Sequence, residues 1–230
     1  MQFSEKELQK RAELLFSNAC SERDYRAEKI PERGDSQTPD FLVHTPMGDF
    51  VAEVKSPGRS EQIKKQKGQE SAVLTLKPGQ HVRDLLKEAS SQLASYRPEL
   101  PCVLVICDLR HNLPDYPVYP LYGFSSAYIA DGMFGETGYA IECHPGQPGV
   151  VWKGPQLGGS RTLRCDEKTH VSALLLLLCH AADSPAGIHG YHNPFAACPF
   201  PDCLLRNPMD RHYRLIIEGD KFQKKWEEFA

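Results

Sequence analysis

Two short apolar segments separated by a proline- and glycine-containing turn constrain this chain most, because together they carry three charged side chains. The segments, Pro39–Val43 and Phe50–Lys55, predict a β-hairpin. Asp40 opens the first segment. Glu53 and Lys55 lie two residues apart near the end of the second, and therefore share one face of their strand. Unpaired charges are costly to bury in apolar strands, so the pattern indicates a functional site.

Two carboxylates beside an amine suit a hard divalent cation. Mg²⁺ prefers carboxylate oxygens, waters and substrate phosphate as ligands. We therefore expect Asp40 and Glu53 to bind Mg²⁺ (or Mn²⁺), with the backbone carbonyl of Val54 as a third ligand. A metal held in this way serves phosphodiester hydrolysis by activating water and neutralising phosphate charge. Lys55 would hold phosphate charge and either orient or deprotonate the attacking water, and the sequence leaves these roles open.

The chain is predicted to begin with a helix at Ser4. Ser4 and Glu7 form a capping box. Apolar residues then recur at helical spacing and form the inward stripe of the helix: Leu8, Ala12, Leu15 and Phe16. Glu7 is explained as the partner in the capping box. Glu13 lies at the edge of the stripe, where it is either a solvated helix charge or an acid directed toward the site.

A second helix is predicted from about Gly79 to Tyr96. Its inward stripe contains Val82, Leu85, Leu86, Ala89, Leu93 and Tyr96. Gln92 lies at the edge of this stripe, one turn before Tyr96. The apolar segment Pro101–Asp108 follows and predicts a fully buried strand. A helix followed by such a strand favours a parallel crossover in a three-layer α/β sandwich.

The combination of Pro39-Asp40 with Glu53-Val54-Lys55 resembles the PD-(D/E)xK nuclease superfamily. Gln92 and Tyr96 resemble the QxxxY motif of its RecB-like branch. The resemblance covers roughly the first half of the chain. It implies a restriction-endonuclease-like core, in which a central mixed sheet is flanked by helices.

The resemblance also implies roles for particular residues. Gln92 would position the substrate or the active site, supported by Tyr96, and Glu13 would supply a further acid from the first helix. The alternative for Tyr96 is an ordinary place in the core. The long polar connection after Lys55 is rich in basic residues, which would either contact nucleic-acid phosphates or remain solvated: Arg59, Lys64, Lys65 and Lys67.

Length and composition favour a single domain over residues 1–230, with the core at about 1–110 and a C-terminal elaboration at about 111–230. The net charge of −3 argues against a wholly basic nucleic-acid coat protein. The polar start indicates no signal peptide, so a cytoplasmic protein is expected. The apolar run Leu174–Leu178 is too short to cross a bilayer, so no membrane association is expected.

The eight cysteines are expected to be reduced thiols. The C-x4-C spacing of Cys198 and Cys203 differs from that of common zinc sites. An iron–sulfur cluster, which some RecB-like nucleases carry, would have to use Cys20, Cys179, Cys198 and Cys203, whose spacing fits poorly.

The second half of the chain gives weaker signals. Val150–Trp152 predicts a strand, and Val171–Cys179 is either a buried strand or a helix, with a strand favoured. Asp115–Tyr122 predicts an irregular loop. The end of the chain, Gly219–Ala230, predicts an amphipathic helix that presents Phe222, Trp226 and Phe229.

The function expected is that of a metal-dependent nuclease acting on DNA, in a setting such as bacterial repair or defence against phage. Partner subunits or a homo-oligomer would fit its small size. The alternative is a nuclease-fold protein that has lost activity and serves as a nucleic-acid-binding or assembly subunit. A small-molecule hydrolase using the cysteines and histidines is disfavoured, because the chain has no nucleophile elbow and no phosphate-binding glycine loop.

Overall fold

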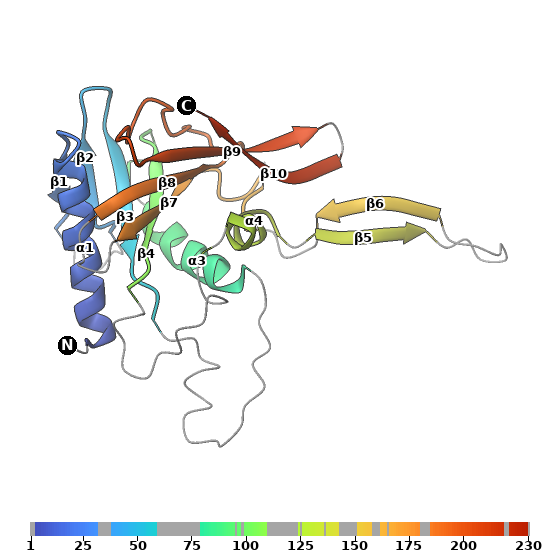
Figure 1. The fold of residues 1–230 in the computed structure, drawn as a ribbon, viewed down its shortest axis with the longest axis horizontal. Helices are drawn as coiled ribbons and strands as arrows, with labels where there is room; N and C mark the ends of the chain where they lie inside the picture. The colour runs from blue at the N-terminus through green and yellow to red at the C-terminus, as the bar shows by residue number, and fades with distance from the viewer. Residues whose placement is uncertain are drawn as a thin grey trace, which may run out of the picture.

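The three-dimensional structure is a computed structural model of the chain. It describes residues 3–31, 38–58, 79–94, 96–97, 99–109, 124, 126–135, 137–142, 151–157, 162–164, 166–179, 185–218 and 221–229. Figure 1 shows a twisted sheet with helices on both faces, and a two-stranded hairpin that extends to one side. The chain therefore has a mixed α/β fold.

Within the described residues, eight strands form one sheet in the order β1-β2-β3-β4-β7-β8-β9-β10. Their bounds are β1 (Arg26–Lys29), β2 (Phe41–His44), β3 (Phe50–Lys55), β4 (Cys102–Cys107), β7 (Val171–Cys179), β8 (Pro185–His192), β9 (Arg211–Glu218) and β10 (Lys221–Phe229). β3, β4 and β7 are parallel to one another, as are β8 and β9, and the other neighbouring pairs are antiparallel. β5 (Thr137–Glu142) and β6 (Val151–Leu157) form the separate antiparallel hairpin. The sheet is therefore mixed, as the sequence predicted.

The sheet lies between two hydrophobic cores. α1 (Glu5–Ser21) covers one face, while α3 (Gln80–Ala94) and α4 (Ser126–Phe134) cover the other. In β4, the side chains of Val103 and Val105 join the α1 core, and those of Leu104 and Ile106 join the α3 core. This alternation follows from the two-residue period of a strand. It also explains why every residue of β4 is apolar and buried.

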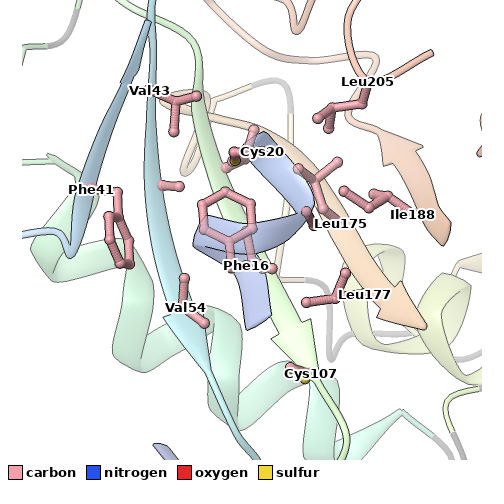
Figure 2. Close-up of a cluster of buried hydrophobic side chains, with 14 of the residues drawn as sticks. Phe16, Cys20, Phe41, Val43, Val54, Cys107, Leu175, Leu177, Ile188 and Leu205 are labelled. Atoms are coloured by element: carbon pink, nitrogen blue, oxygen red, sulfur yellow. The ribbon is translucent and has the colours of Figure 1, made fainter. Parts of the chain in front are cut away.

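The predicted first helix is confirmed, including its start. Ser4 is the N-cap of α1: its hydroxyl accepts a hydrogen bond from the Glu7 amide, and its own amide donates to the Glu7 carboxylate at 2.7 Å. The predicted inward stripe is buried, and Phe16 lies at the centre of the α1 core. Figure 2 shows the Phe16 ring among side chains from α1 and several strands, including Val54 and Leu175.

The helix predicted from about Gly79 is α3, and its stripe from Val82 to Leu93 is buried. The prediction of a strand over Val171–Cys179 is also confirmed. This strand, β7, pairs with β4 on one side and β8 on the other. Its leucines alternate between the two cores. The sheet therefore continues directly from residues before 110 into the second half of the chain.

The predicted C-terminal helix is wrong, because the segment forms β10, an edge strand antiparallel to β9. The Trp226 ring packs against Tyr191 in the α3 core. The Phe229 ring packs instead against His192 and His212 on the opposite face. Residues three apart face opposite sides of a strand, so these aromatics serve both faces of the sheet. In the sequence, Phe222 and Trp226 are four residues apart and Trp226 and Phe229 are three apart, which is also the spacing of a helical stripe.

The cysteines are dispersed over the structure. Cys20 is buried in the α1 core, Cys203 is exposed, and Cys198 is half-buried. Cys179 lies beside Cys107, with 3.6 Å between the sulfur atoms. Among the residues placed by the structure, no three or more His, Cys, Asp or Glu side chains form a metal-binding group, so the described cysteines do not build a cluster site. The described helices are also too short or too polar to cross a bilayer.

Candidate metal-binding site

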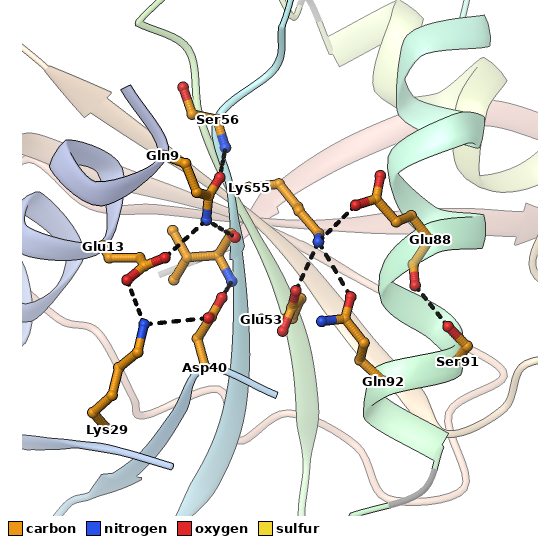
Figure 3. A network of polar contacts seen from close by, with 11 residues as sticks. Gln9, Glu13, Lys29, Asp40, Glu53, Lys55, Ser56, Glu88, Ser91 and Gln92 are labelled. Carbon is orange, nitrogen blue, oxygen red and sulfur yellow. Dashed lines mark hydrogen bonds and ion pairs between the residues drawn. The ribbon is translucent and has the colours of Figure 1, made fainter. Parts of the chain in front are cut away.

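The β2–β3 hairpin brings the predicted acids together at one end of the sheet. Phe41 pairs with Ala52, so Asp40 lies opposite Glu53 on the neighbouring strand. One carboxylate oxygen of Asp40, Oδ2, accepts a hydrogen bond from the Val54 amide at 2.9 Å. Figure 3 shows Asp40 and Glu53 between α1 on one side and α3 on the other. The structure therefore places the two acids as the hairpin pattern predicted.

Glu53 is the most unusual residue of this group because its carboxylate is almost completely buried, with 1% of the residue exposed. Its Oε1 atom lies 2.9 Å from Lys55 Nζ. Its Oε2 atom is buried and has no hydrogen-bond partner. Burial and the nearby charge of Asp40 together raise the pKa of Glu53 to about 7, although Lys55 and Gln92 act to lower it. A buried carboxylate oxygen with no partner is costly, and a bound cation would satisfy it.

Lys55 points toward α3 and contacts three side chains. Its Nζ lies 2.9 Å from Glu53 Oε1, 2.8 Å from Glu88 Oε1 and 3.2 Å from Gln92 Oε1. Burial alone would lower the pKa of Lys55, but the carboxylates of Glu53 and Glu88 outweigh it and raise the pKa. The lysine is therefore held in its charged form. This direction is opposite to the one that a general base requires.

On the other side of β3, α1 contributes a residue that sequence reasoning missed. Gln9 Nε2 donates to the Val54 carbonyl at 2.8 Å and to Glu13 Oε1 at 3.2 Å. Gln9 Oε1 accepts from the Ser56 amide at 2.9 Å. Gln9 thus fixes the end of β3 against α1. The only available signal was its position one helical turn before Glu13.

Glu13 lies near Asp40 and is linked to it through Lys29. The Lys29 ammonium forms a close ion pair with Glu13 Oε2 and lies 3.4 Å from Asp40 Oδ1. Burial raises the pKa of Asp40, while the Val54 amide and Lys29 act to lower it. Burial would lower the pKa of Lys29, but the hydrogen bond with Glu13 and the charge of Asp40 raise it overall. Sequence reasoning also missed Lys29.

The remaining predicted residues divide into three groups. Gln92 joins the Lys55 contacts, as described above. Tyr96 is partly buried and packs against the α3 core, which is the ordinary alternative for this residue. The predicted phosphate-contacting residues lie outside the described residues: Arg59, Lys64, Lys65 and Lys67. Glu88 is an additional member of the site.

The donor set fits one hard divalent cation. It consists of the Asp40 and Glu53 carboxylates and the Val54 carbonyl, which receives one hydrogen bond and retains a second lone pair. Across the described ranges, no three His, Cys, Asp or Glu side chains gather as a metal cage. Two carboxylates with a carbonyl suit Mg²⁺, which usually keeps several waters. The buried Oε2 atom of Glu53 is the observation that favours such an ion.

The raised pKa of Glu53 predicts how stability depends on pH. The pKa is about 7 in the folded protein against an ordinary value of 4.5, so the folded state binds this proton more tightly. The resulting stability is present in full below about pH 4.5 and is lost as the pH rises through about 7. The loss should be on the order of 3 kcal/mol. Glu53→Gln has no proton to lose and should remove this dependence.

Urea unfolding of both proteins at pH 5 and pH 8, without divalent ions, measures this effect. The Glu53→Gln variant should gain stability relative to the original protein at the higher pH. An equal difference between the two proteins at both pH values would show that Glu53 is ionised throughout.

Comparison with known proteins adds little to this geometry. No protein-family model matches the sequence, and no curated protein matches it significantly. Among solved structures, SfsA of Pyrococcus furiosus in complex with Ca²⁺ aligns at 15% sequence identity with a TM-score of 0.22. The alignment covers 62% of this chain and 61% of that chain, so this chain spans less than two thirds of SfsA. A TM-score this low carries no argument about fold or function.

Proposed function

We propose that this protein is a metal-dependent nuclease with a restriction-endonuclease-like core of the PD-(D/E)xK type, and that DNA is its substrate. The observation that carries the proposal is the buried Glu53 carboxylate, which lies beside Asp40 and has one oxygen without a partner. Such an arrangement is costly in a protein that never binds a cation there. The Val54 carbonyl and the Lys55 ammonium complete a set of groups suited to phosphodiester hydrolysis.

Asp40, Glu53 and the Val54 carbonyl would hold one Mg²⁺ or Mn²⁺ ion. A divalent ion at this position supplies a Lewis acid that activates water and neutralises phosphate charge. The protein keeps these ligands in place before the substrate arrives. The Val54 amide orients Asp40, and Gln9 holds the Val54 carbonyl. Such preorganisation lowers the cost of reaching the transition state.

Lys55 would hold the scissile phosphate and orient the attacking water. Its raised pKa supports this role over that of a general base. Gln92 accepts a hydrogen bond from Lys55 and would fix the direction of the ammonium group. Glu88 is exposed, so it can release Lys55 when a phosphate arrives.

Binding to DNA would rest on phosphate contacts. Four basic residues follow Lys55 in the sequence and are proposed to make such contacts: Arg59, Lys64, Lys65 and Lys67. Affinity should then weaken steeply with rising salt. Partner subunits or a homo-oligomer, and a setting in bacterial repair or phage defence, are part of the same proposal.

Incubation with plasmid and with single-stranded DNA tests the proposal. Cleavage is expected with Mg²⁺ or Mn²⁺ and should stop when a chelator is added. The Asp40→Asn variant is the matched negative control, because asparagine can keep the hydrogen bond from the Val54 amide while losing the charge. Binding without cleavage would favour the inactive assembly subunit. Cleavage that persists in chelator or in the variant would contradict the proposed site.

A further inference from the structure

The ammonium group of Lys29 lies between the carboxylates of Glu13 and Asp40, on the α1 side of the site. This lysine comes from β1, and pairing of Lys29 with Phe41 sets it beside the start of β2. Its ammonium group lies against Glu13 Oε2 and at 3.4 Å from Asp40 Oδ1. The same group lies 5.0 Å from the centre of the Phe41 ring, within the range of a cation–π contact. Figure 3 shows Lys29 joined to both acids.

The two acids are directed toward this lysine by their other hydrogen bonds. Asp40 Oδ2 accepts a hydrogen bond from the Val54 amide, and Glu13 Oε1 accepts one from Gln9 Nε2. Two carboxylates held close together repel each other unless a cation lies between them. Lys29 supplies that positive charge from within the chain.

We propose that Lys29 is a built-in counter-ion that limits this site to one divalent cation. This inference rests on the proposed function, because it assumes that Asp40 and Glu53 hold the first ion. A second ion between Asp40 and Glu13 would have to take the place of the ammonium group. Like charges at contact distance repel strongly in a partly buried site, so the second ion is excluded.

Removing the lysine therefore creates a second site. Without Lys29, Asp40 and Glu13 form a pair of carboxylates that lacks a counter-ion, while Gln9 still orients Glu13. Such a pair attracts a divalent cation for the same reason that Asp40 and Glu53 do. Asp40 would then be shared by two ions.

Calorimetric titration with Mn²⁺, in the absence of nucleic acid, counts the bound ions. The original protein is expected to bind one ion per chain, and Lys29→Met is expected to bind two. Lys29→Arg keeps the charge and should bind one. Arg26→Met removes a positive charge from the same strand at an exposed residue paired with Glu28, and should also bind one.

A double variant identifies where the second ion binds. Adding Glu13→Gln to Lys29→Met should return the count to one ion, because the second site needs both acids. Thermal unfolding without metal confirms that each variant is folded. One ion in both the original protein and Lys29→Met would overturn this inference and leave the proposed function standing. Two ions in the original protein would also overturn it, and no ion in the original protein would overturn both.

Discussion

Replacing Lys55 with methionine is expected to lower the rate of DNA cleavage by about a thousandfold or more while the protein remains folded. Methionine keeps most of the length of the side chain but loses the ammonium group that contacts Glu53 and Gln92. Loss of a positioned group that acts on water and phosphate typically costs about 10²- to 10⁴-fold. Glu53 would lose the neighbouring Lys55 ammonium group. Its raised pKa allows it to take up a proton instead, which limits the loss of stability.

Single-turnover cleavage in Mg²⁺ measures the effect, and circular dichroism shows whether the variant is folded. Lys168→Met is the control because Lys168 precedes β7, and the start of β7 lies at the opposite end of the parallel strands from Lys55 at the end of β3. The control should cleave DNA at the original rate. Full activity in Lys55→Met would remove Lys55 from the reaction.

Replacing Arg23 with methionine is expected to destabilise the fold by about 3–5 kcal/mol. Arg23 follows α1 and forms a two-pronged ion pair with Asp210, with N···O distances of 2.8 and 2.5 Å. The two side chains are only 4% and 1% exposed. The Asp210 carboxylate also accepts hydrogen bonds from the backbone amides of Ile188 and Asn207. Loss of Arg23 would leave a buried carboxylate with these two amides alone.

This pair joins the end of α1 to the segment just before β9, so its loss should weaken both halves of the chain together. Urea unfolding at neutral pH measures the change in the free energy of unfolding. Arg26→Met is the control, because the ion pair of Arg26 with Glu28 is 74% and 61% exposed and should contribute less than about 1 kcal/mol. A similarly small change for Arg23→Met would mean that Asp210 finds another partner.

The parts of the structure that follow from local pattern were predictable. The hairpin was visible because apolar alternation, a turn and three charges occur within a short stretch. The register then places Asp40 opposite Glu53. The capping box and stripe of α1 follow the same logic. The strand β4 was visible because a run of buried residues between two cores is apolar throughout.

The parts that depend on pairing between distant segments were not predictable. Lys29 becomes part of the site only because β1 pairs with β2 in the register that sets Lys29 opposite Phe41. Gln9 and Glu88 join it because α1 and α3 pack on opposite faces of β3. The C-terminal strand was mistaken for a helix because aromatics that serve two faces of a sheet happened to fall at helical spacing.

The position of a bound Mn²⁺ ion in a crystal tests the central claim most directly. Anomalous scattering from crystals grown with Mn²⁺ should show one peak about 2 Å from oxygens of Asp40 and Glu53 and from the Val54 carbonyl. The previously unpartnered Oε2 atom of Glu53 should be among these ligands. A peak located elsewhere, or none at these residues at millimolar Mn²⁺, would contradict the account.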